Sequence, residues 1–137
     1  SPCYGGPFLT LHPLVYAELL KKKINEFNVP VYLVNTGWIG GSPSSGAKRI
    51  SIKFTRKMIT AILNNKMDKV EYVQDSIFGL DIPTSLDGIP NEVLNPRHMW
   101  DDKNQYDTEA LNLSNLFKKN FEKYGNSLDH LKEFGPK

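Results

Sequence analysis

Hydrophobic residues recur at intervals of three and four along three stretches of the chain, which is the spacing of one helical face. The first stretch follows Pro13, and proline suits a first helical turn because the N–H that it lacks would be unsatisfied there. The second begins near Thr55, which suits an N-cap, and the third ends at Gly125. The pattern predicts three helices, with the stripes Tyr16, Leu19, Leu20, Ile24 and Phe27; Met58, Ile59, Ile62 and Leu63; and Leu113, Leu116, Phe117, Phe121 and Tyr124.

Short apolar runs between these helices predict extended segments. Residues 31–34 form a continuous apolar run between a proline and the sequence Asn-Thr-Gly, which indicates a strand buried on both faces. Residues 49–53, 69–74 and 76–83 show further extended patterns, and the tail, 126–137, has the spacing of a short last helix. Helices and strands follow one another without regular βαβ alternation, so we predict a mixed α/β (α+β) fold.

Size and charge limit the classes of protein to consider. The chain has 137 residues, the usual size of one domain, and we expect residues 1–137 to form a single piece. A net charge of +2 is too small to favour nucleic acid or an acidic membrane surface as a partner. No apolar run approaches the ~20 residues that span a bilayer. The opening SPCYGGPF reads like the middle of a chain, so we expect a piece of a longer protein.

The single cysteine, Cys3, excludes an internal disulfide and fits a reducing, cytoplasmic compartment. It has no nearby His or Lys pair that would lower its pKa, so we do not expect it to be a nucleophile. Trp38 and Trp100 are expected to be packing residues rather than stacking platforms.

Glycines lie close to a Lys-Arg pair in residues 37–53, GWIGGSPSSGAKRISIK. A phosphate loop needs G-x-x-x-x-G-K-[ST] between a strand and a helix N-terminus. Here Ala47 separates Gly46 from the lysine, and Arg49 stands where the metal-binding hydroxyl belongs. The segment therefore fails as a phosphate loop. Two interpretations stay open: a flexible surface loop, or a loop that closes over a ligand, with the planar guanidinium of Arg49 stacking on a base or pairing with an anion.

Other polar clusters are weaker candidates. His98, Asp101 and Asp102 lie close together in RHMWDD, but their spacing matches no standard metal-ligand motif. A loop that caps the following helix is the expected interpretation, and we predict no metal site. His12 precedes the first helix and is expected to cap it or to pack there.

Several motifs, taken in order, resemble one family. YLVNTGWIGG is followed by KRISIKFTR, with FLTLHPLVYAELL before them and IPTSLDGIPNEVLNPR and LFKKNFEKY after them. The chain thereby resembles the C-terminal part of ATP-dependent phosphoenolpyruvate carboxykinase. The resemblance implies the C-terminal, nucleotide-side lobe of a two-lobed fold, with a mixed sheet and flanking helices.

The resemblance also implies an activity and a site. The family makes phosphoenolpyruvate, ADP and CO₂ from oxaloacetate and ATP, in gluconeogenesis, with Mg²⁺ and Mn²⁺. It implies that Arg49, Ile50 and Thr55 bind ATP on the adenine side. It further implies that no catalytic residue and no metal ligand lies in this chain, because the family's phosphate loop, metal ligands and dicarboxylate-binding arginines lie upstream. This sequence carries GGSPSSGA where some relatives have a shorter turn.

Expected partners are therefore ATP, oxaloacetate and the remaining lobes of the same polypeptide, and an exposed lobe interface could let the piece associate with itself. The piece alone is predicted to be inactive. Two alternatives stay open: a non-catalytic nucleotide-binding module and a protein-interaction domain.

Overall fold

The computed structural model describes residues 5–137, apart from the side chains at positions 43, 126 and 127, and Cys3 lies outside the described residues. The chain divides into two compact units, Ser1–Leu33 and Val34–Lys137, which are described separately.

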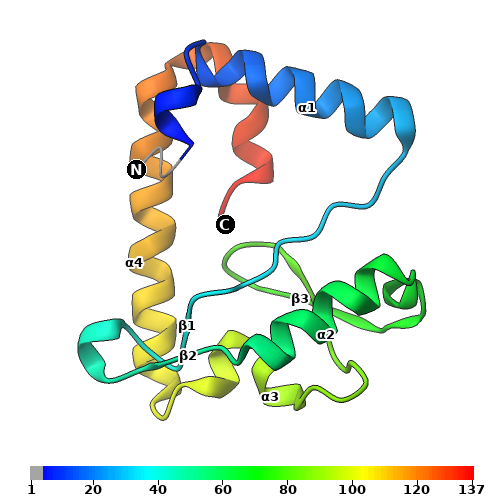
Figure 1. Cartoon of the computed structure of the whole chain (residues 1–137). Helices are drawn as coiled ribbons and strands as arrows, with labels where there is room; N and C mark the ends of the chain where they lie inside the picture. The colour runs from blue at the N-terminus through cyan, green and yellow to red at the C-terminus, as the bar shows by residue number, and fades with distance from the viewer. Residues whose placement is uncertain (1–4) are drawn as a thin grey trace. The chain divides into compact units, whose positions relative to one another are not determined.

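The first unit contains one short 3₁₀ turn, Gly6–Phe8, and the helix α1, Pro13–Phe27 (Figure 1). Pro13 occupies the first helical turn as predicted, and His12 is the N-cap, its Nδ1 accepting the Leu14 N–H at 3.3 Å. The predicted capping role of His12 is therefore confirmed. The helix ends at Asn28, which adopts the left-handed conformation with φ of 47°.

The apolar positions of this unit lie open. Neither helix of the unit contains a buried residue, and Phe27 is 61% exposed. The prediction of a buried strand at residues 31–34 is wrong in this structure, since no strand is assigned there and Val31 and Leu33 are 62% and 81% exposed. A strand needs a neighbour to pair with its N–H and C=O groups, and none of the described residues pairs with this segment.

The second unit carries the remaining elements (Figure 1). Its strands pair as two antiparallel hairpins, β1 with β2 and β3 with β4. Its helices and strands, in chain order, are β1 Trp38–Ile39, η2 Pro43–Ser45, β2 Lys48–Arg49, α2 Ile52–Leu63, η3 Lys66–Lys69, β3 Tyr72–Gln74, β4 Asp81–Pro83, α3 Asn91–Leu94, η4 Pro96–Met99, α4 Lys103–Phe121, η5 Glu122–Tyr124 and η6 Asn126–Phe134.

The mixed α/β class is thus confirmed, with small antiparallel sheets in the described residues. The strands predicted within 69–74 and 76–83 are the β3–β4 hairpin, in which Val73 is opposite Ile82. The short last helix predicted for the tail is the 3₁₀ helix η6. Within residues 5–137, no helix combines the length and the apolar character needed to cross a membrane.

The start of α2 corrects two predictions. The chain is extended only to the end of β2, and residues 52 and 53, predicted as extended, already belong to the helix. The N-cap is Ser51, whose hydroxyl accepts the Lys53 N–H at 3.3 Å, and not Thr55, which lies one turn inside. Serine in the β conformation satisfies a free N–H of the first turn, so the helix begins at the earlier hydroxyl.

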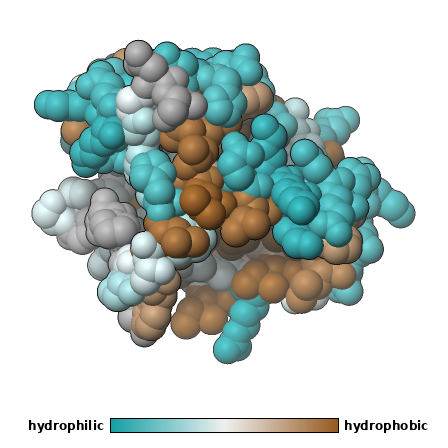
Figure 2. Space-filling view, turned by 90° about the horizontal axis from the view of Figure 1, so that it is seen from above, coloured by the Kyte–Doolittle hydropathy of each residue, from teal (hydrophilic) through white to brown (hydrophobic). Residues whose placement is uncertain are grey.

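The core of the second unit is small. Its deepest residue is Ser114 on α4, at 1% exposed, and its hydroxyl donates to the Lys137 carbonyl at 3.4 Å. The predicted stripe of α4 is not the buried face, because Leu116 and Phe117 are 63% and 52% exposed. On the face of the whole chain drawn in Figure 2, hydrophobic side chains are exposed among hydrophilic ones. The buried hydrophobic residues are Ile50, Ala61, Met67, Leu86, Ile89, Ala110 and Leu128.

The turn before α4 is fixed by polar contacts. Asp102 caps α4 as predicted, its Oδ1 accepting the N–H groups of Asn104 at 2.8 Å and Gln105 at 3.2 Å. Arg97 donates two hydrogen bonds to Asp107, at 2.8 and 2.9 Å, in a bidentate ion pair.

This ion pair predicts an acid-dependent contribution to stability. The hydrogen bonds from Arg97 hold the pKa of Asp107 below its usual range. Because the folded pKa is below the unfolded one, the stabilisation is present above the unfolded pKa near 4 and is lost as pH falls through the folded pKa. We expect Asp107→Asn to lower the free energy of unfolding at pH 7 but much less at pH 2, as measured by urea denaturation. Asp101→Asn is the control, and an equal effect of Asp107→Asn at both pH values would contradict the interpretation.

Candidate functional site

The β1–β2 hairpin carries the candidate site. Trp38 pairs with Arg49 and Ile39 with Lys48, and the hairpin is extended by the Ile50 N–H, which donates to the Gly37 carbonyl at 2.8 Å. The loop between the strands contains the glycines of the sequence motif, and α2 begins directly after the second strand. The elements follow one another in a strand–loop–strand–helix order, so the predicted failure of the phosphate-loop motif is confirmed by its structural context.

The backbone of the loop closely approaches η4 at Gly40. Gly40 has φ of +76°, and a Cβ at this position would lie 2.7 Å from the Met99 carbonyl oxygen. Gly46 also has a positive φ, +79°, but a Cβ there would meet nothing within 4 Å. Gly40 is therefore required both because of its positive φ and because a Cβ has no room there, whereas Gly46 is required because of its positive φ alone.

Arg49 is exposed, and its guanidinium lies over an indole ring. Its central carbon is 5.9 Å from the centroid of the Trp38 ring, within the range of a cation–π contact. No carboxylate of the described residues lies within ion-pair distance of Arg49. Trp38 is 46% exposed and does not belong to the buried core of its unit, and its ring contacts Arg49. Trp100 does pack, edge-on against Tyr106 with the ring centroids 5.8 Å apart.

Ile50 and Thr55 differ from Arg49 in their surroundings. Ile50 is 6% exposed and belongs to the core of its unit. Thr55 is half-buried, and its hydroxyl donates to the Ser51 carbonyl at 3.5 Å, a long bond that leaves the oxygen lone pairs free to accept. The structure thus joins Arg49 and Ile50 at the exit of β2 and places Thr55 in the following helical turn.

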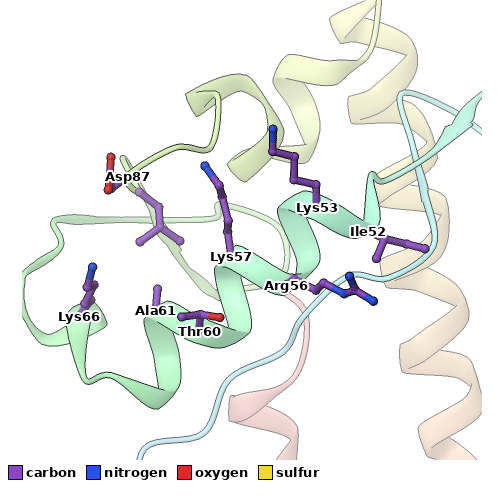
Figure 3. Close-up of a pocket in the computed structure, with 9 residues that line it drawn as sticks. Ile52, Lys53, Arg56, Lys57, Thr60, Ala61, Lys66 and Asp87 are labelled. Carbon is purple, nitrogen blue, oxygen red and sulfur yellow. The ribbon is translucent and has the colours of Figure 1, made fainter.

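A separate pocket lies along α2, with a volume of about 630 Å³ (Figure 3). Its lining is basic, and Lys57 donates to the Gly88 carbonyl at 2.9 Å. Lys53 and Lys57 project from one side of the helix, while Arg56 and Thr60 leave from another. The lining residues are Ile52, Lys53, Arg56, Lys57, Thr60, Ala61, Lys66, Leu86 and Asp87.

None of Arg49, Ile50 and Thr55 lines this pocket, so it is distinct from the predicted site. Sequence reasoning missed both this basic surface and the contact between Trp38 and Arg49. The surface combines α2 with a turn more than twenty residues later, at Leu86 and Asp87, so it needed the tertiary fold. The position of Trp38 opposite Arg49 follows from the hairpin register, which two short strands joined by a glycine-rich loop did not reveal in the sequence.

The described residues contain no group of three or more His, Cys, Asp or Glu side chains arranged to hold a metal ion. Of the cluster weighed in the sequence, Asp102 is the cap of α4.

The chain is similar to known proteins along its whole length. The family model for phosphoenolpyruvate carboxykinase matches residues 1–92. All 137 residues align with "Phosphoenolpyruvate carboxykinase (ATP)" of Caldanaerobacter subterraneus subsp. tengcongensis at 49% identity and with that of Brevibacillus brevis at 50% identity. The protein of the same name from Christiangramia forsetii is 50% identical over 124 residues, 90% of this chain.

The alignments cover 26%, 26% and 23% of these three relatives, so the chain spans about a quarter of their length. The family match extends over more than half of the chain, through both the hairpin and α2. The chain therefore belongs to the phosphoenolpyruvate carboxykinase family.

Proposed function

We propose that this chain is the C-terminal part of an ATP-dependent phosphoenolpyruvate carboxykinase and forms the adenine side of its ATP site. The parent reaction is ATP + oxaloacetate = ADP + phosphoenolpyruvate + CO₂, a step of gluconeogenesis, and we place it in the cytoplasm. One observation supports this most strongly: the family match includes the hairpin that presents Arg49, which forms no ion pair with a carboxylate of the described residues.

Each of the three residues offers adenine a different interaction. The guanidinium of Arg49 is planar and can stack on the ring or donate to it. The hydroxyl oxygen of Thr55 can accept a hydrogen bond from the exocyclic amino group of adenine. Ile50 is mostly buried, so its contribution to a base is limited to the small part of its apolar side chain that stays exposed.

Phosphoryl transfer needs more than these groups supply. The transferred phosphoryl is stabilised by metal ions and by positive charge fixed around its oxygens. The described residues do not fit a metal site, so we assign no Mg²⁺ or Mn²⁺ ligand here and derive no step through a metal. The proposed role is to bind and orient the nucleotide base, which lowers the entropy cost of bringing the γ-phosphate to its acceptor.

The remaining lobes of the parent polypeptide are the proposed partner of the exposed apolar residues. Leu33 and Val31 are 81% and 62% exposed in a run that has the composition of a buried strand. An apolar run of this kind is usually covered in a stable protein. In the isolated chain it could instead mediate self-association.

Leu33→Ala tests this partnership. In a full-length carboxykinase with this segment, we expect it to reduce the free energy of unfolding by about 2 kcal/mol, because a buried leucine would be truncated. In the isolated chain we expect a change within about 0.5 kcal/mol, because the side chain is already exposed. Chemical denaturation of the wild type and the variant, in the full-length protein and in the isolated chain, measures the two changes in the free energy of unfolding. Equal effects in the two proteins would show that the segment stays uncovered.

The proposed function is tested by assaying phosphoenolpyruvate formation from oxaloacetate and ATP, with Mg²⁺ and Mn²⁺ supplied. We expect turnover by the full-length protein and none by the 137-residue chain. The 137-residue chain is expected to bind ATP weakly, because it is proposed to form only the adenine side of the site and not the phosphate side. Turnover by the chain alone would overturn the assignment, and a full-length protein that binds ATP without turnover would favour a non-catalytic nucleotide-binding module.

A further inference from the structure

We propose that Trp38 is a positioning residue for the nucleotide base: its indole holds the Arg49 guanidinium in the plane that stacks on the purine. This inference rests on the proposed function, because it assumes that Arg49 contacts adenine. It adds a residue that the sequence alone assigned to packing.

The first support is the environment of the guanidinium. Arginine in proteins is commonly oriented by a carboxylate, which occupies the N–H donors. Here no ion pair to Arg49 exists among the described residues, and the ring of Trp38 lies 5.9 Å from the guanidinium carbon instead. A contact with an aromatic face restrains the group without using its N–H donors, so they stay available to a ligand.

The second support is that the backbone carrying Trp38 is fixed from both sides. The Asn35 side chain donates to the Trp38 carbonyl at 3.2 Å and accepts the Gly37 N–H at 2.8 Å. Across the hairpin, Ile50 is buried, and its N–H donates to the Gly37 carbonyl. An indole on a fixed backbone has only two rotatable side-chain bonds, whereas the arginine side chain is long and flexible. Ordering it before the ligand arrives lowers the entropy cost of binding.

The third support is the shape of the ligand that such a pair fits. A guanidinium has two faces, and when one lies on an indole the other can lie on a second flat ring. The resulting order is indole, guanidinium, base. Purines have a larger ring surface than pyrimidines, so the layer favours a purine nucleotide over a pyrimidine one. Both Trp38 and Arg49 are exposed, as a pair that receives a ligand must be.

The test is a set of variants of a full-length carboxykinase that carries this segment, assayed for the KM for ATP and for kcat. We expect Trp38→Leu to raise the KM for ATP about three- to fivefold and to leave kcat unchanged, since a base-orienting contact is lost. Trp38→Phe should restore most of the affinity because it keeps an aromatic face. The ratio of activity with ATP to activity with CTP should fall in Trp38→Leu. Trp100→Phe, at the packed tryptophan, is the matched control and should leave the KM unchanged.

A double-variant comparison separates positioning from structure. If Trp38 acts through Arg49, Trp38→Leu should not raise the KM further in an Arg49→Ala background. Fluorinated tryptophans at position 38, in a Trp100→Phe background, weaken the negative ring face while keeping its shape. They should raise the KM progressively with fluorine content, and this series remains informative if Trp38→Leu does not fold.

The outcomes are distinct. If Arg49→Ala raises the KM and neither Trp38→Leu nor the fluorinated series does, the positioning role is wrong and the proposed function stands. If Arg49→Ala has no effect, the adenine site and the positioning role both fail. If Trp38→Leu raises the KM equally with and without Arg49, or lowers kcat and thermal stability together, its role is structural and the inference is overturned.

Discussion

Replacing Arg49 with alanine in a full-length carboxykinase with this segment is expected to raise the apparent KM for ATP about tenfold, equivalent to about 1.4 kcal/mol. The guanidinium is exposed, free of carboxylates among the described residues, and supported on the Trp38 ring. Its removal abolishes both the stacking surface and the charge. The KM for oxaloacetate should stay unchanged, because the proposed contact is with the base. Steady-state kinetics with each substrate varied in turn measures both constants.

Lys48→Ala is the matched control. Lys48 is an exposed cation next to Arg49 in the same strand, but it pairs with Ile39 rather than Trp38. A charge effect alone would change ATP affinity equally in both variants and would vanish at high salt. We expect Lys48→Ala to change the KM less than twofold. An unchanged KM in Arg49→Ala would show that the adenine lies elsewhere.

Replacing Gly40 with alanine is expected to destabilise the isolated chain by about 2–4 kcal/mol. Its φ of +76° strains any L-residue by about 1–2 kcal/mol. The new Cβ would also lie 2.7 Å from the Met99 carbonyl oxygen, so the loop or η4 must shift. A shift would move the hairpin that carries the candidate site. Urea denaturation, followed by circular dichroism, measures the loss.

Gly46→Ala separates the two causes. Gly46 shares the positive φ, but a Cβ there has no neighbour within 4 Å. We therefore expect a loss of only about 1 kcal/mol. The difference between the two variants reports the cost of the close approach at Gly40. Equal losses would show that the hairpin does not rest against Met99.

Local signals in the sequence predicted the helices well. Pro13 marks the start of α1, Asp102 caps α4 and Gly125 follows its last 3₁₀ turn. The start of α2 was misplaced, because Ser51 and Thr55 are both acceptable caps and only the structure shows which hydroxyl meets a free N–H. When two residues could both cap a helix, its first residue depends on where the preceding strand ends.

The sequence was less informative about tertiary contacts. The apolar run at Val31 and Leu33 has the composition of a buried strand, but its burial requires a neighbour that the described residues do not provide. The apolar stripe of α4 shows the same effect, since Ala110 and Ser114 are buried while the larger residues are exposed. Periodicity identifies an apolar face but does not show what covers it.

The candidate site, too, was predicted from the sequence only in part. Arg49, Ile50 and Thr55 were predicted from a family resemblance, and the family itself is confirmed by the match over residues 1–92. Their role in binding adenine stays a prediction. The contact between Arg49 and Trp38 depends on which residues of the hairpin are opposite each other, and loop length and glycine conformation set that register.

The most direct test of the adenine site is a crystal structure of a full-length carboxykinase with this segment and ATP bound. The account predicts that the adenine ring stacks on the Arg49 guanidinium, with Trp38 on the opposite face and the Thr55 hydroxyl within hydrogen-bond distance of a ring or amino nitrogen. An adenine bound away from the β1–β2 hairpin, with Arg49 turned to solvent or to another partner, would contradict it.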